Sequence, residues 1–382
     1  MLRAFYSFLF LLGTTAAAQA QPDDIIRIAN GVLDSTQHST LGLTPAPGTE
    51  TITIFHPTDS DDHYANGVVM TAFKDALYCM WQSSAQDEDS PDTWVACSHS
   101  CDNGQTWTKP QPLAVANDTA YCTSGGWIAS GDTLVAFVNV WPKHLSPTGG
   151  YTYYSTSTNG TTWSNLQSVT MVDGSPMNGV IEQDPITLSS GRIVGAAHFQ
   201  PGLHVCPIYT DHPLGTGGWH KGFMPTEDRG NQSRELEPSL YQRRDGTLVM
   251  IFRDQQSTFR KRVSVSRDGG LSWTQPATTN IPDARVKQSA GQLPDGTIFL
   301  AANPVAAKRR YPLALLLSSD GIVFDRAYLM RANSDLSPQR YPGKAKTPGY
   351  NYPKSFVHNG YIYVAYSENK EDVVFTRVPI AH

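Results

Sequence analysis

The sequence contains the stretch Ser100-Cys101-Asp102-Asn103-Gly104-Gln105-Thr106-Trp107, and its Ser-x-Asp-x-Gly-x-x-Trp pattern returns at Ser266, Asp268, Gly270 and Trp273. Weaker copies are Thr156, Thr158, Gly160 and Trp163, and the run Ser318-Ser319-Asp320-Gly321 that ends in Phe324. The pattern predicts a turn, because Asp accepts backbone N–H bonds, Gly adopts a positive φ and the aromatic ring packs back on a sheet. A turn that recurs along the chain indicates a repeat protein.

A second repeat is a strand-like run that returns after about every 50–60 residues. Its copies are Ala76–Gln82, Thr133–Asn139, Arg192–His198, Thr247–Arg253, Thr297–Asn303 and Tyr361–Ser367. Each run is too short and too rich in β-branched or aromatic residues for an ordinary helix. We therefore predict an all-β protein, a single-domain β-propeller over residues 21–382.

The number of blades stays open between six and seven. Six repeat units are visible, at about 66–114, 119–170, 174–224, 233–279, 283–332 and 350–380. The last unit is short, and Thr51–Phe55 is available to complete it. Residues 24–57 are alternatively long enough to supply most of a seventh blade.

Residues 1–20 read as a secretory signal peptide, with a basic start, a short apolar run and a small-x-small site at Ala18-Gln19-Ala20. We therefore expect a secreted, extracellular protein, monomeric and without a membrane span. The sequons at Asn117, Asn159 and Asn231 predict a glycoprotein if the chain is secreted. A net charge of −5 without a basic run argues against a nucleic-acid partner.

Five cysteines in an exported chain favour one or two disulfides. Cys79 and Cys97 fall on two runs that we expect to be adjacent strands, so they are the preferred pair. The cysteine spacings are not typical of a metal site, and we predict none.

Propeller geometry predicts where the functional site lies, because the second strand of each blade ends on the funnel face and the innermost strand starts there. The residues that close the second strands are all polar: Gln82, Asn139, His198, Arg253, Asn303 and Ser367. The innermost strands start near His63 and Asn66, Gln183 and Asp184, Glu237, Lys287 and Gln288, and Tyr352 and Lys354. Converging titratable groups of this kind are candidates for acid–base chemistry and sugar binding.

The repeated turn resembles the Asp-box of sialidase-like propellers, in which it has a structural role. Sialidases of this fold bind a carboxylate with three arginines, use a Tyr/Glu nucleophile pair and carry an Arg-Ile-Pro-type motif near the N-terminus. Here His63-Tyr64-Ala65-Asn66-Gly67 stands in place of that motif, and only Arg253 resembles one of the three arginines. The sequence therefore disfavours a true sialidase.

The run from His63 to Trp94, with Glu237-Pro238-Ser239-Leu240, Tyr352-Pro353-Lys354 and Tyr366 to Glu371, resembles another Asp-box group. It is similar to the seven-bladed L-rhamnose-α-1,4-D-glucuronate lyases, formerly called α-L-rhamnosidases. The resemblance implies seven blades, an acidic glycan as the partner and His63 as a catalytic residue.

Elimination of a sugar from glucuronate needs a cation at the carboxylate, a base and an acid. Arg253 and Lys287 suit the first role, His63 or His198 the second, and Tyr352 or the other histidine the third. The expected substrate-binding residues are Asn66, Gln82, Asn139, Gln183, Asp184, Glu237, Lys287, Gln288 and Lys354. No organic or redox cofactor is implied, and a structural cation in the channel stays open.

Two alternatives remain. A hydrolase of the same fold needs two carboxylates about 5–10 Å apart, for which Asp184 and Glu237 are the candidates. A lectin-like propeller without catalysis needs only aromatic platforms and neutral polar groups; Trp127 and Trp141 are the candidate platforms.

Overall fold

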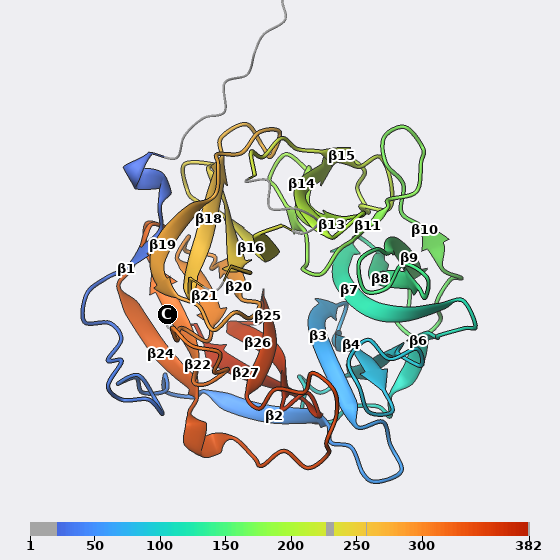
Figure 1. Cartoon of the computed structure of the whole chain (residues 1–382), viewed down its shortest axis with the longest axis horizontal. Coiled ribbons are helices and arrows are strands. Elements are labelled where there is room, and N and C mark those ends of the chain that lie inside the picture. Colours follow the sequence, from blue (N-terminus) through green and yellow to red (C-terminus); the bar gives the residue numbers. More distant parts are fainter. Residues whose placement is uncertain (1–20, 227–232, 257, 381–382) are drawn as a thin grey trace, which may run out of the picture.

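The computed structural model describes residues 21–226, 233–256 and 258–380. The predicted signal peptide and Asn231 of the third sequon lie outside these residues. Six antiparallel sheets stand around a common axis as the blades of a propeller (Figure 1). The described residues thus contain six blades, and the prediction of seven was wrong.

In each blade the chain runs from the axis outward. The first three blades are β3 Tyr64–Phe73, β4 Ala76–Ser84, β5 Trp94–Ser100 and β6 Gln111–Ala114; β7 Ala120–Ser130, β8 Thr133–Pro142, β9 Tyr151–Ser157 and β10 Gln167–Ser168; and β11 Gly179–Val180, β12 Ile186–Thr187, β13 Ile193–Phe199, β14 His204–Thr210 and β15 His220–Lys221. In the third blade β11 and β12 both pair with β13, so two short strands share the innermost position.

The other three blades continue around the ring. They are β16 Glu235–Gln242, β17 Leu248–Asp254, β18 Arg260–Ser266 and β19 Ala277–Pro282; β20 Ser289–Gln292, β21 Ile298–Ala302, β22 Leu313–Ser318 and β24 Arg326–Arg331; and β25 Tyr350–His358, β26 Tyr361–Glu368 and β27 Asp372–Pro379. The six runs predicted as equivalent strands are the second strands of the six blades.

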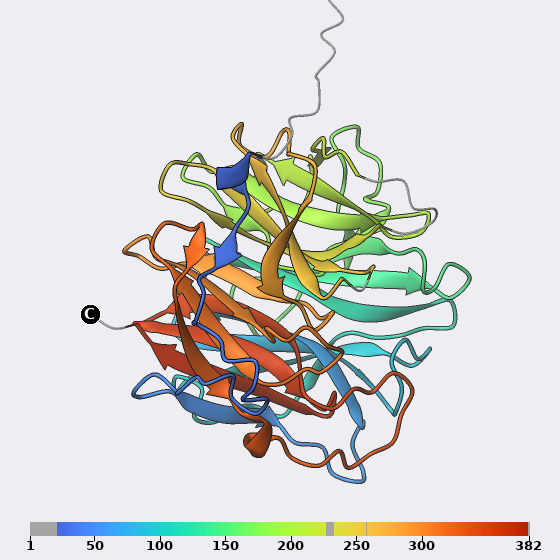
Figure 2. The same cartoon turned by 60° about the vertical axis from the view of Figure 1, so that its left-hand side comes forward.

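The last blade is completed by β2 Glu50–Phe55, which pairs antiparallel with β27. This confirms that Thr51–Phe55 completes the short last unit and ties the two ends of the ring together. The rest of the N-terminal segment runs along the outside of the propeller (Figure 2). It includes the short helix η1 Pro22–Asp24 and β1 Arg27–Ile28, which pairs with β23 Val323–Phe324. A second short helix, η2 Asn333–Asp335, follows β24.

The Asp-box turns follow the third strands of four blades. In the first, Ser100 Oγ lies 2.7 Å from Asp102 Oδ1, the Thr106 N–H donates to the same carboxylate at 2.9 Å, and Trp107 Nε1 donates to Gly104 O at 3.0 Å. Because strands alternate in direction, these turns lie at the end of the blades opposite the funnel face.

One predicted Asp-box was misplaced by a residue. Ser157 and Asn159, rather than Thr156 and Thr158, fill the Ser and Asp positions: Gly160 N donates to Ser157 Oγ at 2.8 Å, and Thr162 N to Asn159 Oδ1 at 2.8 Å. The fourth copy matches the prediction, with Gly321 N donating to Ser318 Oγ at 2.9 Å.

Hydrophobic packing between neighbouring blades forms the core. Between the fourth and fifth blades, for example, Ile251 and Val263 pack with Leu300 and Leu316, all nearly inaccessible to solvent. Each blade thus buries the apolar faces of its neighbours, which is what makes the ring stable. Among the described residues no helix is long and apolar enough to cross a membrane.

The predicted disulfide between Cys79 and Cys97 does not form, and all five cysteines are free thiols. The two residues do lie on adjacent strands, but Cys79 pairs with Ser98 and Cys97 with Met80. The offset of one residue sends the two thiols to opposite faces of the sheet. Cys79 packs toward the last blade and Cys97 toward the second.

Candidate active site

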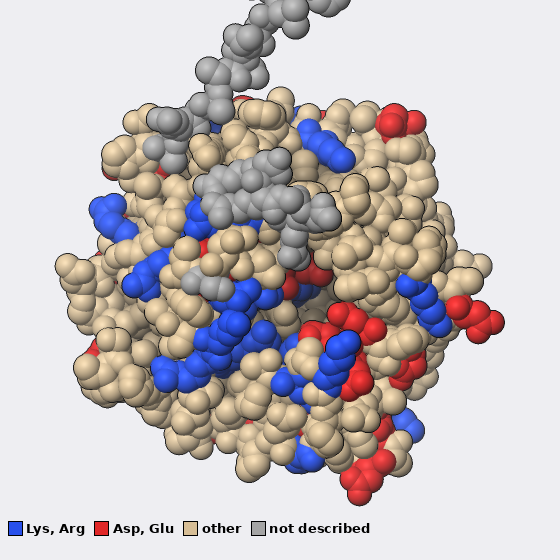
Figure 3. Space-filling model, viewed as in Figure 1, with Lys and Arg blue, Asp and Glu red and all other residues tan. Residues whose placement is uncertain are grey.

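A cavity of about 490 Å³ opens at the centre of the funnel face. It is visible as a hollow in Figure 3, with Lys and Arg gathered mostly on one side and Asp and Glu on the other. Five of the six blades contribute lining residues, which include Asn66, Thr123, His198, Arg253 and Tyr352. The pocket therefore brings together segments that are far apart in the sequence.

Bulges in the innermost strands position two of the pocket's side chains. The pairing of β16 with β17 shifts between Leu236 and Ser239, and that of β25 with β26 shifts between Asn351 and Lys354. Inside these bulges Glu237 and Tyr352 adopt left-handed conformations, with φ of 48° and 55°. Such strained bulges redirect side chains, and here both side chains line the pocket.

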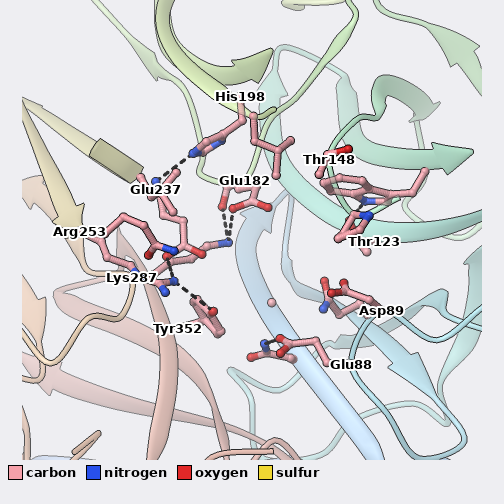
Figure 4. Close-up of a pocket in the computed structure, with 18 of the residues that line it drawn as sticks. Glu88, Asp89, Thr123, Thr148, Glu182, His198, Glu237, Arg253, Lys287 and Tyr352 are labelled. Carbon is pink, nitrogen blue, oxygen red and sulfur yellow. Dashed lines mark hydrogen bonds and ion pairs between the residues drawn. The ribbon is translucent and has the colours of Figure 1, made fainter. Parts of the chain in front are cut away.

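Glu237 and Tyr352 are both held by Arg253. The Nη1 atom of Arg253 donates to Glu237 Oε2 at 2.8 Å and to the Tyr352 hydroxyl oxygen at 3.4 Å (Figure 4). The Arg253 and Glu237 side chains are only 14% and 10% exposed, so this ion pair is poorly screened by water. The carboxylate and the phenol therefore both contact one guanidinium nitrogen, and both line the pocket.

Three further cations surround the Tyr352 ring. Lys287 Nζ, the Arg310 guanidinium and Lys370 Nζ lie 5.0, 5.1 and 5.5 Å from the ring centroid. Burial, followed by the charge of Glu237, raises the pKa of Tyr352 well above its usual value, while Arg253 and Arg310 oppose that rise. The phenol is therefore neutral at rest, but a phenolate formed there would have several positive charges close by.

Two of these lysines have carboxylate partners on the pocket wall. Lys287 Nζ lies 3.2 Å from Glu182 Oε2, and Lys370 Nζ lies 2.7 Å from Glu88 Oε1. Burial opposes the ionisation of Glu182, yet the charge of Lys287, its hydrogen bond to the carboxylate and the charges of neighbouring groups together outweigh burial and lower the pKa of Glu182 to about 2. Burial lowers the pKa of Lys370 to about 8. Each lysine thus has a carboxylate as its counter-charge on the pocket wall.

Asp89 stands on the pocket rim, in the turn between β4 and β5, across the cavity from Tyr352 (Figure 4). The residue as a whole is exposed, and among the described residues no cation pairs with its carboxylate within 4.0 Å. Partial desolvation at the pocket mouth, followed by the charges of Glu88 and Glu182, raises the pKa of Asp89 to about 6. A carboxyl group with a raised pKa is suited to donate a proton near neutral pH.

His198 is buried and neutral. Its Nε2 accepts a hydrogen bond from the Glu237 backbone N–H at 3.0 Å, and burial lowers its pKa. Because that bond occupies the Nε2 lone pair, this nitrogen is not free to take a proton from a ligand. His198 thus supports the bulge that carries Glu237.

The structure brings together seven of the thirteen residues predicted for the site. Those that line the pocket are Asn66, Gln82, His198, Glu237, Arg253, Lys287 and Tyr352. Of the two candidate sugar platforms, Trp141 lines the pocket and Trp127 does not.

His63 lies outside the set of residues that line the pocket. Its ring stacks on Tyr341 with centroids 3.8 Å apart, and its backbone N–H donates to Ala85 O at 3.1 Å. The signal that suggested it, a histidine just before the first innermost strand, placed the backbone correctly but not the side chain.

Five other predicted residues hold the blades together below the pocket. Asn139 donates to Ile181 O at 2.8 Å, Gln183 to Gln288 O at 2.8 Å, Gln288 to Ile251 O at 2.8 Å and Lys354 to Gly125 O at 2.6 Å, while Asp184 accepts from Trp127 N at 2.8 Å. These side chains satisfy backbone groups of neighbouring strands, as buried polar groups must.

Sequence reasoning missed Glu88, Asp89, Glu182 and Arg310. All four lie in the segments between strands, and none closes an aligned strand. Glu182 directly precedes Gln183, so alignment of the innermost strands one residue earlier would have found it. No group of three or more His, Cys, Asp or Glu side chains in the described residues is arranged to hold a metal ion.

An antiparallel six-bladed ring with Asp-box turns and a polar axial pocket defines a sialidase-like β-propeller. The model of the BNR repeat-like domain matches residues 75–364, and the chain belongs to this family. The search of curated protein sequences gave no match.

Solved structures share the fold at low sequence identity. A sialidase superposes with a TM-score of 0.66 at 18% identity over 94% of this chain and 35% of that chain. A protein of unknown function from Dyadobacter fermentans gives 0.65 at 14% identity over 88% of this chain and 100% of that chain. The Trypanosoma rangeli sialidase in complex with sialic acid gives 0.63 at 15% over 88% and 60%. This chain spans about a third of the first of these proteins, and the likeness concerns the fold.

Proposed function

We propose that the protein is a retaining exo-glycosidase that hydrolyses a terminal acidic sugar from a glycan, with Tyr352 as the nucleophile. The observation that carries this proposal is the contact of one nitrogen, Arg253 Nη1, with both the Tyr352 hydroxyl and the Glu237 carboxylate. A phenol paired with a carboxylate is the nucleophile arrangement of the sialidases, whereas most glycosidases use two carboxylates.

Glu237 is the base that activates Tyr352. The phenol needs one, because burial raises its pKa. Attack of the phenolate oxygen on the anomeric carbon forms a covalent glycosyl-tyrosine and breaks the bond to the leaving oxygen. The cations around the ring stabilise the phenolate while its charge develops.

The same cations select a sugar with a carboxylate on or beside its anomeric carbon. Arg253 and Arg310 are the guanidinium groups next to Tyr352, and guanidinium suits bidentate carboxylate binding. A neutral phenol also approaches such a carbon with less repulsion than an ionised Asp or Glu would meet. Lys370 takes the place of a third arginine in this arrangement.

Asp89 is the general acid. Its carboxyl group faces Tyr352 across the pocket, and its pKa, raised to about 6, keeps part of it protonated near neutrality. It protonates the leaving oxygen in the first step and then takes a proton from the water that hydrolyses the glycosyl-tyrosine.

Hydrolysis accounts for the pocket better than β-elimination from rhamnosyl-glucuronate. The elimination expected from the sequence depends on a histidine base, but His63 does not line the pocket and His198 Nε2 accepts a backbone hydrogen bond. The alternative carboxylate pair, Asp184 with Glu237, is also split, because Asp184 accepts a bond from Trp127 N outside the pocket.

The test is a set of 4-methylumbelliferyl glycosides, including a sialoside and a glucuronide, with ultraviolet detection of unsaturated uronate as the assay for elimination. We expect release of the fluorophore from the carboxylate-bearing sialoside, and a loss of at least about 10³-fold in kcat for Tyr352→Phe. Tyr341→Phe is the control, because Tyr341 is half-buried, stacks on His63 and does not line the pocket. An unsaturated uronate product, or full activity of Tyr352→Phe, would contradict the proposal.

A further inference from the structure

A second cavity lies beside the active-site pocket and shares Arg253 with it. Its volume is about 280 Å³, and it is lined by Arg253, Ala284, Arg285, Lys308, Arg310 and Thr347. Four of these six residues are cations and none is acidic. We call this cavity the side pocket.

The cations of the active-site pocket are neutralised by the protein itself. Arg253, Lys287 and Lys370 each form an ion pair with a carboxylate, at 2.8, 3.2 and 2.7 Å. Those positive charges are therefore already balanced before any ligand arrives.

The cations that line the side pocket but not the active-site pocket are not paired with carboxylates in this way. Within the described residues, Arg285, Lys308 and Arg310 have no carboxylate partner within 4.0 Å. Arg285 donates to the main-chain and side-chain oxygens of Gln255, and Arg310 to the amide oxygen of Asn351. Both guanidinium groups thus bind neutral oxygens and keep their full charge.

The nearest acidic residue in the sequence is already engaged elsewhere. Asp283 accepts from buried Lys261 at 2.8 Å and from the backbone N–H groups of Asp254 and Arg285, each at 2.9 Å. In addition, the Nε atoms of Arg253 and Arg285 are buried and have no hydrogen-bond partner in the part of the chain that the structure describes. The protein holds these cations in place without supplying a counter-charge, so an anion is the missing partner.

We propose that the side pocket binds a second anionic group of the glycan, a sulfate ester or a further carboxylate, in addition to the carboxylate of the sugar that is cleaved. The inference rests on the proposed function for the identity of the ligand as a glycan. Arg253 lines both cavities, so a substituent in the side pocket is next to the sugar in the active-site pocket. Arg285 and Lys308 then determine specificity without taking part in catalysis, and the preferred substrate carries at least two negative charges.

The first experiment measures anion binding without a glycan. Inorganic sulfate is titrated calorimetrically, at low ionic strength, into the wild type, Tyr352→Phe and the double variant Arg285→Gln/Lys308→Gln. We expect equal binding by the first two and at least about tenfold weaker binding by the double variant. Arg309→Gln is the control, because it removes one positive charge from the loop that holds Lys308, whereas Arg309 stacks on Tyr311 and does not line the side pocket. Equal sulfate binding by the double variant, or none by the wild type, overturns the site.

The second experiment measures hydrolysis of 3′-sialyllactose with and without a sulfate ester on the terminal sialic acid, the sugar that occupies the active-site pocket. We expect the ester to lower KM about 10-fold to 100-fold in the wild type, and this advantage to disappear in the double variant while kcat is kept. An ester advantage that survives in the double variant overturns the proposal. The proposal is also overturned if the wild type binds free sulfate but the ester does not lower KM, since the side pocket then binds an anion from solution and not a group of the glycan. If neither trisaccharide is cleaved, the proposed function fails, and the sulfate titration still decides the side pocket.

Discussion

The reactivity of Tyr352 depends on the residue beside it. A buried phenol holds its proton tightly, and the carboxylate of Glu237 is the group placed to accept that proton, since both contact Arg253 Nη1. The arginine also fixes the two groups in one orientation, so a change at Glu237 tests the chemistry without removing the phenol.

We predict that Glu237→Gln lowers kcat by about 10²-fold to 10⁴-fold, the usual contribution of one positioned proton-transfer group. Glutamine keeps an oxygen that accepts from Arg253 and differs little in volume, so the melting temperature and the dissociation constant for the product sugar should change little. Steady-state kinetics and differential scanning calorimetry on the same preparation make the comparison. A variant with near-normal kcat would remove Glu237 from the mechanism.

The raised pKa of Asp89 predicts where kcat/KM falls on the alkaline side of its pH profile. The protonated form donates to the leaving oxygen, and desolvation with the charges of Glu88 and Glu182 raises its pKa to about 6. kcat/KM should therefore be highest below about pH 6 and fall as the pH rises through that value.

The Asp89→Asn variant should lose that alkaline fall in kcat/KM and suffer more with a poor leaving group, such as lactose, than with 4-methylumbelliferone, which needs little protonation. Asp87→Asn, in the same turn, is the control; Asp87 accepts from the Lys344 backbone N–H at 2.7 Å. Equal losses for the two leaving groups would show that Asp89 is not the acid.

At the scale of the element, bulges in the innermost strands place functional side chains in the pocket. The bulges in β16 and β25 direct Glu237 and Tyr352 into the pocket, and the first blade has a bulge at the corresponding place, with Gly67 at φ +60°. A Cβ at Gly67 would lie 2.7 Å from Ser124 Oγ, which explains the glycine there.

The elements also show how far the sequence could predict the structure. The six second strands and the Asp-box turns followed from short patterns, because period-2 strands and Gly-containing turns are set by local physics. The bulges carry no such pattern, and the turn that holds Asp89 has no fixed register to a strand. Glu182 lines the active-site pocket and Arg310 lies against the Tyr352 ring, and both come from segments between strands. Their positions depend on the assembled ring, so the sequence alone could not place them.

The Asp-box turns contribute stability and not catalysis. Asp268 accepts hydrogen bonds from Ser266 Oγ and from the backbone N–H groups of Leu271 and Ser272. Asp268→Ala leaves these donors without that partner, and we expect a loss of about 1–3 kcal/mol of unfolding free energy. kcat/KM of the folded fraction should stay unchanged at 25 °C.

Asp132→Ala is the control for this prediction, because Asp132 is 93% exposed and makes only a 3.7 Å pair with Lys74. Thermal unfolding followed by circular dichroism gives the stability difference. An Asp268→Ala protein that is as stable as the control, or that loses turnover while fully folded, would contradict a structural role.

On the scale of the whole molecule, the ring is closed by a strand from the other end of the chain. β2 pairs with β27, and the same blade carries Tyr352 on β25. Opening this junction should therefore weaken the site as well as the fold.

We predict that Ile52→Pro/Thr53→Pro lowers the melting temperature and the activity together, because successive N–H groups of a strand point in opposite directions and one of the two must face β27. Ile52→Ala/Thr53→Ala keeps the backbone donors and should be much milder. Equal behaviour of the two variants in thermal unfolding and turnover would show that β2 is dispensable for closure.

The charge distribution also belongs to this scale. Cations gather on one side of the central hollow and carboxylates on the other (Figure 3). Under the proposed function, an acidic glycan binds with its anionic groups toward Arg253, Arg285 and Arg310 and its leaving group toward Asp89. Binding should consequently weaken as the ionic strength rises.

The most direct test of the account is to trap the covalent intermediate on Tyr352. The enzyme is incubated with 2,3-difluorosialic acid, whose fluorines slow release of the sugar, and the intact mass and the proteolytic peptides are measured by mass spectrometry. We predict the addition of one sugar per chain, located on Tyr352 and absent from Tyr352→Phe. A protein that hydrolyses the sialoside but is never labelled, or is labelled at another residue, would contradict the assignment of Tyr352 as the nucleophile.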